Sequence, residues 1–334
     1  MSGRAIPLQI LGTGEFVPST RAESEEFDRR WGKSAGWTQR QTGVVSRAYA
    51  GPGEDVVTMG AAAARDALAT AGVEARQLDA IVCVGSVPYQ AIPCTAAFLQ
   101  RALGLENSGI AAFDVNATCL GFVVALDLIA QAVATGRYRT VLVVASECVS
   151  IGLEDSDHTT AGLFGDGAGA AVIGAARRSG AQLRASHVQT FSSGLEFCQI
   201  RSGGSAVDPR TRLDEFLEGT VFEMQGRQTY KLAAELLPQF LATLLDRAGV
   251  QAQQVQTWVP HQASGRAIAH LQKALDLPVD RFISTIETSG NQVSASLPVA
   301  LHRGVASGRI KPGDTVALVG SGAGLSFGGA VLDF

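Results

Sequence analysis

Charged residues are scarce in this chain of 334 residues, at 17% of the total, and a basic excess is missing, since 27 Lys and Arg face 31 Asp and Glu. A chain with so few charges and 46% hydrophobic residues is neither disordered nor a highly charged coiled coil. The formal net charge of −4 argues against a general nucleic-acid-binding protein, which normally has a basic balance. The composition therefore indicates a globular protein with a large core, of a length suited to two domains or one large one.

Long uncharged hydrophobic runs and closely spaced cysteines are also missing. The most apolar stretches, 119–134 and 161–176, are each interrupted by an aspartate, so we expect no membrane span. The N-terminal residues show no cleavable signal pattern. No two of the five cysteines, at positions 83, 94, 119, 148 and 198, lie two to four residues apart, so a zinc framework is excluded and no metal site is expected. We therefore expect a cytoplasmic protein with reduced thiols, in which a special cysteine is chemical rather than structural.

Apolar runs alternate with amphipathic stretches along the whole chain. Strands rich in Val and Ile are predicted at 78–85 and 140–146, and helices at 59–71 and 119–135, the second of them apolar on nearly all sides. The C-terminal part repeats this alternation, with helices predicted at 232–248 and 265–275 and strands at 255–259 and 315–319. The pattern is typical of an α/β protein with largely parallel, covered sheets.

Two segments of the sequence resemble each other: TGRYRTVLVVAS at 135–146 and SGRIKPGDTVALVGS at 307–321. Counting back 17 residues from the glycine of each segment leads to Cys119 in the first half and to Asn291 in the second. Each half then ends in a glycine-rich stretch that we interpret as a hairpin, at 164–174 and 320–332. These offsets predict a duplicated chain with an N-terminal half at 1–178 and a C-terminal half at 179–334. Cys119 and Asn291 would open equivalent buried helices; the alternative is a chance similarity of two Gly-Arg turns.

Cys119 lies in DVNATCLGF, where a predicted strand passes into a predicted helix. A thiol at a helix N-terminus feels the positive end of the helix dipole, which lowers the thiol pKa toward the thiolate. The simpler interpretation is a buried hydrophobic residue. Among the other cysteines only Cys94 could also open a helix, so it is the one rival nucleophile.

His261 directly follows a predicted strand, at the strand end where α/β proteins gather their sites. With Cys119 and Asn291 it completes a set able to perform nucleophilic acyl transfer, although a single histidine in such a place can be structural. The glycine-rich strings at 165–169 and 320–324 do not open helices after a first strand, so they are not dinucleotide fingerprints and disfavour an NAD-linked oxidoreductase. Their better use is close backbone approach, with an N–H directed at the active site.

Five segments in one order carry a resemblance to a known family: DVNATCLGF, FGDGAGA, VPHQA, SASLPVAL and GAGLSFGG. Together they resemble the β-ketoacyl-acyl-carrier-protein synthase III family of the thiolase-like superfamily, over nearly the whole chain. The resemblance implies a thiolase-like duplicated five-layered α/β/α/β/α fold in homodimers. It also implies acyl-CoA or acyl-carrier-protein thioesters as substrates and no cofactor.

The same resemblance implies a reaction and its catalytic residues. Cys119 would be acylated, and His261 and Asn291 would stabilise the carbonyl of a malonyl thioester as it decarboxylates. The backbone N–H groups of Cys119 and Gly324 would form the oxyanion hole. The product would be a β-ketoacyl thioester of fatty acid or related secondary metabolism. Two alternatives stay open: transfer of the acyl group to a hydroxyl or amine, and a non-catalytic subunit that only binds carrier protein.

The resemblance further implies substrate contacts, with departures from the family. Gln41 and His158 stand where the family has arginine, and Ser264 stands where it has asparagine, so we expect weak use of free CoA thioesters and a preference for carrier protein. Ile92 would come from the partner subunit and cannot act as the glutamate base of relatives that join two acyl chains head to head. The implied substrate-binding residues are Trp37, Ile92, Phe122, His158, Phe222, Met224, Gly226 and Ser264.

Overall fold

The computed structural model describes residues 5–334, and its two main sheets share one strand order. The first sheet runs β1 (Gln9–Phe16), β7 (Gly167–Gly174), β6 (Thr140–Glu147), β4 (Ala80–Cys83), β5 (Ala111–Asp114). The second runs β8 (Gln182–Thr190), β13 (Ser326–Asp333), β12 (Thr315–Gly322), β11 (Thr257–Pro260), with a bridge from Trp258 to Phe282 in the place of a fifth strand. In both sheets the equivalent neighbours are parallel or antiparallel alike. The chain passes from the first sheet to the second between Gly174, the end of β7, and Gln182, the start of β8.

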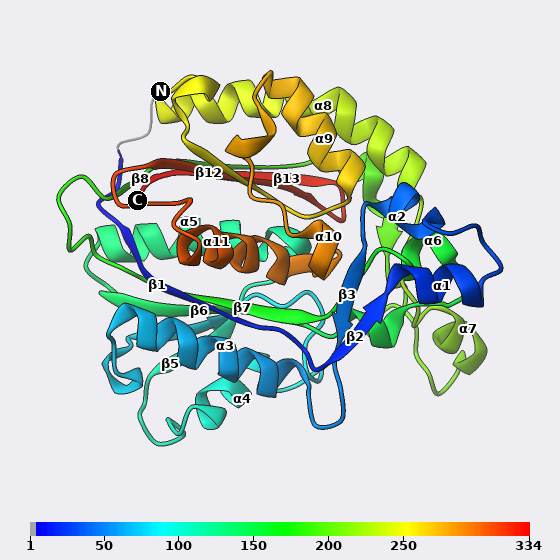
Figure 1. Cartoon of the computed structure of the whole chain (residues 1–334). Coiled ribbons are helices and arrows are strands. Elements are labelled where there is room, and N and C mark those ends of the chain that lie inside the picture. Colours follow the sequence, from blue (N-terminus) through cyan, green and yellow to red (C-terminus); the bar gives the residue numbers. More distant parts are fainter. Residues whose placement is uncertain (1–4) are drawn as a thin grey trace.

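Helices form three layers around these sheets (Figure 1). The helices α3 (Val56–Ala71) and α4 (Thr95–Ala102) cover the outer face of the first sheet, and α8 (Gly226–Ala248) and α9 (Gly265–Leu275) cover that of the second. Between the sheets lie α5 (Gly121–Ala134) and α11 (Ser296–Ala306). The five-layered α/β/α/β/α fold is therefore confirmed. No helix within residues 5–334 has the length and apolar character needed to cross a membrane.

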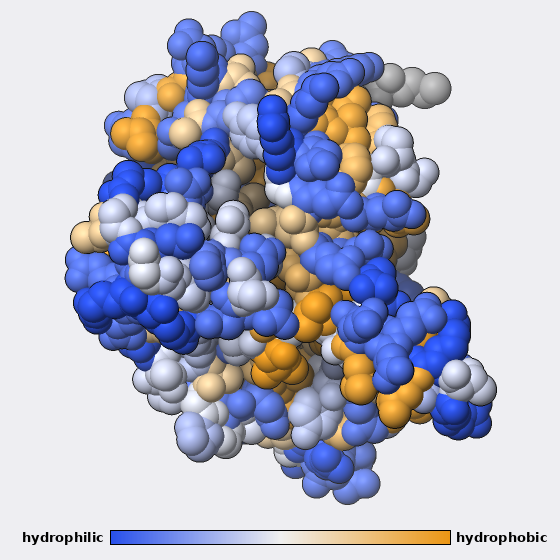
Figure 2. Space-filling view, turned by 90° about the vertical axis from the view of Figure 1, so that its right-hand side faces the viewer, coloured by the Kyte–Doolittle hydropathy of each residue, from blue (hydrophilic) through white to orange (hydrophobic). Residues whose placement is uncertain are grey.

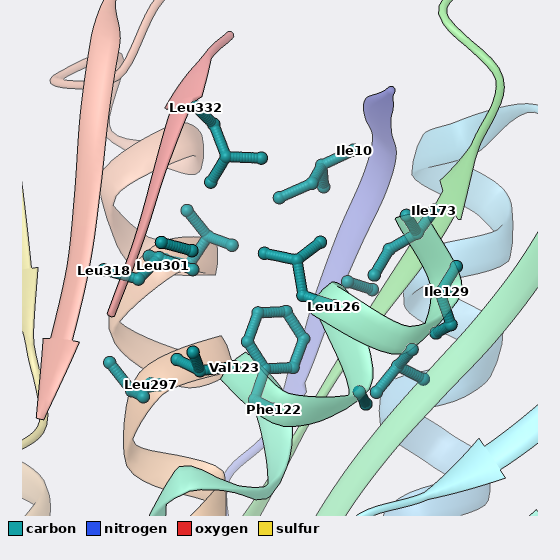
Figure 3. Close-up of a cluster of buried hydrophobic side chains, with 14 of the residues drawn as sticks. Ile10, Phe122, Val123, Leu126, Ile129, Ile173, Leu297, Leu301, Leu318 and Leu332 are labelled. Atoms are coloured by element: carbon teal, nitrogen blue, oxygen red, sulfur yellow. The ribbon is translucent and has the colours of Figure 1, made fainter. Parts of the chain in front are cut away.

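The middle layer holds the largest hydrophobic cluster (Figure 3). Phe122 and Leu126 of α5 and Leu297 of α11 are fully buried there, between side chains of both sheets such as Ile173 and Leu318. Each such side chain contributes roughly 1.5–3 kcal/mol by leaving water. The two central helices are thus held rigidly, and with them the turns at their N-termini.

Smaller elements gather at one end of the layers, on the right of Figure 1. Figure 2 shows this end from outside, with hydrophobic side chains in a hollow near the centre of the face. The elements are β2 (Thr20–Glu23), β3 (Ser46–Tyr49), β9 (Cys198–Gln199), β10 (Glu223–Met224), α1 (Ser24–Arg30), α2 (Trp37–Thr42), α6 (His158–Ala161), α7 (Leu213–Glu218) and α10 (Ile286–Ser289).

One of the two predicted hairpins is wrong. The stretch 320–332 does form the hairpin of β12 and β13, whereas 164–174 contains only the single strand β7. That strand pairs with β6 on one side and β1 on the other, so its glycines lie between two backbones rather than in a turn. Gly169, for example, has no room for a Cβ, which would lie 2.8 Å from the backbone nitrogen of Val299.

The predicted equivalence of Cys119 and Asn291 is also wrong, by three residues. Each central helix is preceded by a 3₁₀ turn whose first residue has a positive φ, 49° at Thr118 and 50° at Val293. Cys119 therefore corresponds to Ser294, and Asn291 lies in the loop before the turn. The error arises because α11 has 11 residues and α5 has 14, so counting back from the helix ends shifts the helix starts.

Candidate active site

Cys119 is the second residue of the turn Thr118–Leu120 that leads from β5 into α5. The side-chain oxygen of Asn116 accepts a hydrogen bond of 3.0 Å from the backbone N–H of Thr118. This bond supports the left-handed backbone of Thr118, a conformation that costs a non-glycine residue about 1–3 kcal/mol. Cys119 thus lies at the strand-to-helix junction that the sequence predicts.

The pKa of the Cys119 thiol is raised to about 12, contrary to the lowering expected at a helix N-terminus. Burial is the main cause, and the carboxyl group of Glu147 acts in the same direction. The backbone N–H groups of Ala323 and Cys119 oppose it by hydrogen bonding to the sulfur. Desolvation outweighs these donors, so the thiol is protonated before a substrate enters.

The backbone N–H of Ala323, which acts to lower the pKa of the Cys119 thiol, was missed by the sequence interpretation. Gly324, predicted for the oxyanion hole, is the next residue of the same turn, and its φ of 113° favours glycine. A glycine-rich string predicts close backbone approach, but it does not tell which of its N–H groups points inward.

His261 follows β11 directly, and its backbone N–H donates to the carbonyl of Val319 in β12 over 2.8 Å. Burial lowers the pKa of the imidazole to about 4, so the ring is neutral at pH 7. Gly320 separates this residue from the nucleophile turn: a Cβ there would lie 2.6 Å from Cβ of His261 and 3.3 Å from Leu120. Glycine at this place therefore lets the histidine approach the turn that carries Cys119.

Asn291 is joined to the loop of His261. Its Nδ2 donates to the carbonyl of Ala263 over 3.4 Å, and its Oδ1 accepts from the backbone N–H of Val293 over 2.9 Å. Its own backbone N–H donates to the carbonyl of Leu163. His261 and the turn of Cys119 therefore adjoin each other at Gly320 of β12, and Asn291 is bound to the loop of His261, although the three lie far apart in the sequence.

The buried imidazole of His261 should make the free energy of unfolding depend on pH. In the unfolded chain the ring takes up a proton near pH 6.5, whereas in the folded chain it does so only near pH 4. The neutral ring therefore contributes fully to the free energy of unfolding above pH 6.5. This contribution is lost as the pH falls toward 4, and the free energy of unfolding drops by about 2–3 kcal/mol. We expect His261→Gln to flatten the fall in unfolding free energy between pH 7 and 4.5, measured by urea titration. An unchanged pH dependence in the variant would contradict this.

Trp37 and His158 lie in an aromatic cluster at the open end of the layers. The ring of His158 stacks on Trp31 at 4.6 Å, and Trp37 meets both rings edge to face. Gln41, at a predicted place of a missing arginine, accepts a hydrogen bond of 3.3 Å from the guanidinium of Arg266. A cation from α9 therefore stands close to this position, which the sequence comparison at position 41 alone could not reveal.

The other predicted contacts fall into two groups. Phe222 and Met224 pack in one hydrophobic cluster with Phe164, and Gly226 begins α8 beside Met224. Ser264 accepts a hydrogen bond from the backbone N–H of Ala267 and so caps α9.

Phe122 and Ile92 differ in exposure, and their roles as substrate contacts stay predictions. Phe122 is fully buried in the central cluster (Figure 3), where it has the core-packing role. Ile92 is 84% exposed.

Cys198 is a neighbour of Cys119 that the sequence interpretation missed. It pairs with Met224 between β9 and β10, and it lies close enough to Cys119 to raise the pKa of that thiol. A cavity of about 70 Å³ also adjoins His261, bounded mainly by α8 and α9. Within residues 5–334 no three His, Cys, Asp or Glu side chains are grouped as a metal would need.

A duplicated fold in which the turn before one central helix carries a cysteine, next to a loop with a buried neutral histidine to which an asparagine is bonded, is that of a thiolase-like acyltransferase. Comparisons with known proteins narrow this class. Residues 113–192 match the family described as 3-oxoacyl-[acyl-carrier-protein (ACP)] synthase III, and residues 245–334 match its C-terminal part. The chain is 34% identical over 323 residues to the β-ketoacyl-[acyl-carrier-protein] synthase III of Clostridioides difficile, covering 97% of each chain.

Solved structures agree. The 3-oxoacyl-[acyl-carrier-protein] synthase III of Aquifex aeolicus superposes with a TM-score of 0.88 at 29% identity, covering 98% of this chain and 100% of the other. The priming β-ketosynthase of a polyketide biosynthetic pathway has a TM-score of 0.86 at 30% identity, covering 98% and 96%. The chain belongs to the β-ketoacyl-acyl-carrier-protein synthase III family. It is an acyltransferase that forms a β-ketoacyl product by decarboxylative Claisen condensation.

Proposed function

We propose that Cys119 carries the acyl group in this reaction and that His261 and Asn291 serve the condensation step. The observation that carries the proposal is that His261 and the turn of Cys119 both adjoin Gly320 of β12, while Asn291 is hydrogen-bonded to the loop of His261. In the first half-reaction the sulfur attacks the carbonyl carbon of the acyl donor. A new C–S bond forms, the old one breaks, and the thiol proton passes to the departing thiolate.

The second half-reaction begins when the malonyl thioester loses CO₂. The electron pair of the broken C–C bond forms an enolate, whose oxygen needs hydrogen-bond donors. A neutral imidazole and a carboxamide both supply N–H groups without adding a fixed charge, and the low pKa of His261 keeps its ring neutral. The enolate carbon then attacks the acyl carbon, and the sulfur of Cys119 leaves as a thiolate, which takes up a proton from water and restores the thiol. We propose that the backbone N–H groups of Cys119 and Gly324, together with that of Ala323, hold the oxyanion of the tetrahedral intermediates.

The reaction is tested by its products. Purified protein given an acyl donor and malonyl-carrier protein should release one CO₂ per β-ketoacyl product, measured by mass spectrometry and trapped radiolabelled CO₂. An acyl ester or amide formed on a hydroxyl or amine acceptor without CO₂ would instead support plain acyl transfer and contradict condensation.

We also propose that two copies of the chain pair along β5. This strand is the edge of its sheet, no strand within residues 5–334 pairs with its outer side, and its Phe113 is 37% exposed. Ile92 is 84% exposed on the loop that precedes α4, as suits a residue that completes the acyl pocket of a partner subunit.

A charge on this edge should separate the copies, because edge strands that carry lysine resist pairing. Light scattering during gel filtration should give twice the chain mass for the unmodified protein and one chain mass for Phe113→Lys. Val279→Lys is the matched control, since Val279 is 70% exposed far along the chain, outside β5. A Phe113→Lys protein of unchanged mass would contradict pairing through β5.

For the donor, we propose that acyl-carrier protein is preferred and that Arg266 supports the residual use of acyl-CoA. Gln41 offers no charge to a phosphate, but the guanidinium of Arg266 lies against it. Replacement of an exposed cation costs about 0.5–1.5 kcal/mol, so Arg266→Ala should lower kcat/KM for acyl-CoA roughly 3–10-fold. The control is Arg40→Ala, because the Arg40 guanidinium is turned back onto Ser34 and Ala35. Equal kcat/KM for both donors in the unmodified protein would contradict the preference.

The metabolic role stays a proposal as well. Both a fatty-acid-type synthase and a polyketide priming synthase are similar to the chain to nearly the same extent, which supports a role in either kind of pathway. The cytoplasmic location expected from the sequence stays a prediction, supported by the CoA and carrier-protein thioesters that the reaction consumes.

A further inference from the structure

Glu147 is a buried acidic residue that the reaction described above does not use. It ends β6, its exposed fraction is 2%, and its carboxyl group accepts four hydrogen bonds. Oε1 accepts from the backbone N–H of Ser86 at 2.7 Å and from the backbone and side chain of Ser294 at 3.4 and 2.5 Å, and Oε2 accepts from Oγ of Ser86 at 2.8 Å. A carboxyl group is costly to bury, and only a full set of donors makes such a place tolerable.

The bonds to Ser86 lead to the nucleophile. The carbonyl of Ser86 accepts a hydrogen bond of 3.0 Å from Nδ2 of Asn116. The other end of that carboxamide accepts from Thr118, the residue before Cys119. Glu147 is therefore connected to the turn of Cys119 through one loop residue and one side-chain amide.

The bonds to Ser294 lead to the second half of the site. Ser294 is fully buried and is the middle residue of the turn Val293–Ala295 that opens α11. The residue before it, Val293, donates its N–H to Oδ1 of Asn291. The carboxyl group of Glu147 thus touches the turn that orients Asn291.

The duplication explains how the two turns divide their roles. Asn116 and Asn291 correspond, since each accepts from the N–H of the positive-φ residue two positions later. In the first turn the asparagine is bound to the scaffold through Ser86, and the following Cys119 stays free for chemistry. In the second turn Ser294, in the place of Cys119, is bound to Glu147, and Nδ2 of Asn291 makes only a long bond of 3.4 Å to the carbonyl of Ala263. Glu147 is therefore bonded directly to the second turn, and it reaches the first through Ser86, which holds Asn116.

We propose that Glu147 is a positioning residue for condensation, which fixes the turn of Cys119 relative to the turn of Asn291 through Ser86 and Ser294. The proposal rests on the roles proposed above for Cys119 and Asn291. Acylation needs only the first turn and the oxyanion hole, whereas condensation needs the two turns at a fixed position relative to each other. A displacement of about 1 Å between reacting groups can cost about 10²-fold in rate.

The test compares the two half-reactions in variants of this network. Glu147→Ala should lower the condensation rate about 100-fold and change self-acylation of Cys119 less than about fivefold, because only condensation requires that fixed position. Ser294→Ala removes one hydroxyl on the Asn291 side and keeps the backbone. It should also slow condensation more than acylation, by a smaller factor than Glu147→Ala, and it keeps the test available if Glu147→Ala folds poorly. Ser146→Ala is the matched control, since the buried hydroxyl of the neighbouring Ser146 has no hydrogen-bond partner within residues 5–334.

Glu147→Gln adds a readout that a purely structural role would not move. The amide still accepts at one oxygen, so condensation should return to within about tenfold of the unmodified rate. The charge that disfavours the Cys119 thiolate is removed, so the pH profile of iodoacetamide labelling at Cys119 should move about one pH unit lower. Peptide mapping separates this label from Cys83, which also lies near Glu147.

Condensation at the unmodified rate in Glu147→Ala and Ser294→Ala would overturn the inference. So would equal losses in both half-reactions that follow the loss of thermal stability. If the unmodified protein is not acylated at Cys119 at all, the proposed function fails and the inference fails with it, so the two failures are told apart by that one measurement.

Discussion

Replacement of Cys119 by serine is expected to abolish self-acylation, with a loss of at least about 10³-fold in rate. A serine hydroxyl is hardly ionised at neutral pH and no base is bonded to it here, whereas the thiol can lose its proton as the acyl donor binds. The two side chains have nearly the same size, so the turn Thr118–Leu120 should keep its form. The measurement is the intact-protein mass after incubation with an acyl thioester, which should gain one acyl group in the unmodified protein and none in Cys119→Ser.

Cys94→Ser is the matched control for this result. Cys94 precedes α4 as the N-cap, so it does open a helix, but its thiol points toward the carbonyl of Ala112 at 3.8 Å, in the first sheet. The control should acylate as the unmodified protein does. Label retained by Cys119→Ser and lost in Cys94→Ser would assign the nucleophile to Cys94 and contradict the site.

His261→Ala and Asn291→Ala are expected to become acylated but to condense about 10²–10³-fold more slowly, since each removes one donor to the enolate oxygen. Acylation should stay within about tenfold, because the sulfur relies on the N–H groups of Ala323 and Cys119. Single-turnover measurements with a pre-acylated enzyme and malonyl-carrier protein separate the two steps.

His302→Ala serves as the control for these variants. His302 lies on α11 but bonds to Thr13 of β1, away from the nucleophile turn. It should condense normally. If instead acylation fell in His261→Ala as severely as in Cys119→Ser, the histidine would be the base that activates the thiol, and its assignment to the second step would be wrong.

Most of the fold could be predicted because its signals are local and repeated. The Val-rich strand at 140–147 is almost wholly buried, and the apolar helix after Cys119 buries most of its residues, although Leu128, Gln131 and Ala134 are exposed; such segments are recognisable from composition alone. The sequence-based prediction failed where the structure depends on which strands pair with each other. The glycines of β7 look like turn residues, yet they are there because helices and strands approach them from both sides.

The candidate site shows the same limit. The types of the three reactive side chains and their places after strands could be predicted, but the protonation of Cys119 could not, because burial in the folded chain outweighs the helix terminus. Glu147 and Arg266 were missed since their importance comes from contacts across long stretches of sequence, to Ser294 and to Gln41. No spacing in a single chain reveals such contacts.

The central claim, an acyl-Cys119 intermediate consumed by decarboxylative condensation, is tested most directly by a chase experiment. Enzyme acylated with a ¹³C-labelled acyl thioester is freed of donor, mapped by peptide mass spectrometry, and then given malonyl-carrier protein. The account predicts that the label leaves the peptide containing Cys119 and appears at the β-keto carbon of the product at the same rate as CO₂ is released. Label that stays on Cys119 while product and CO₂ form would contradict it.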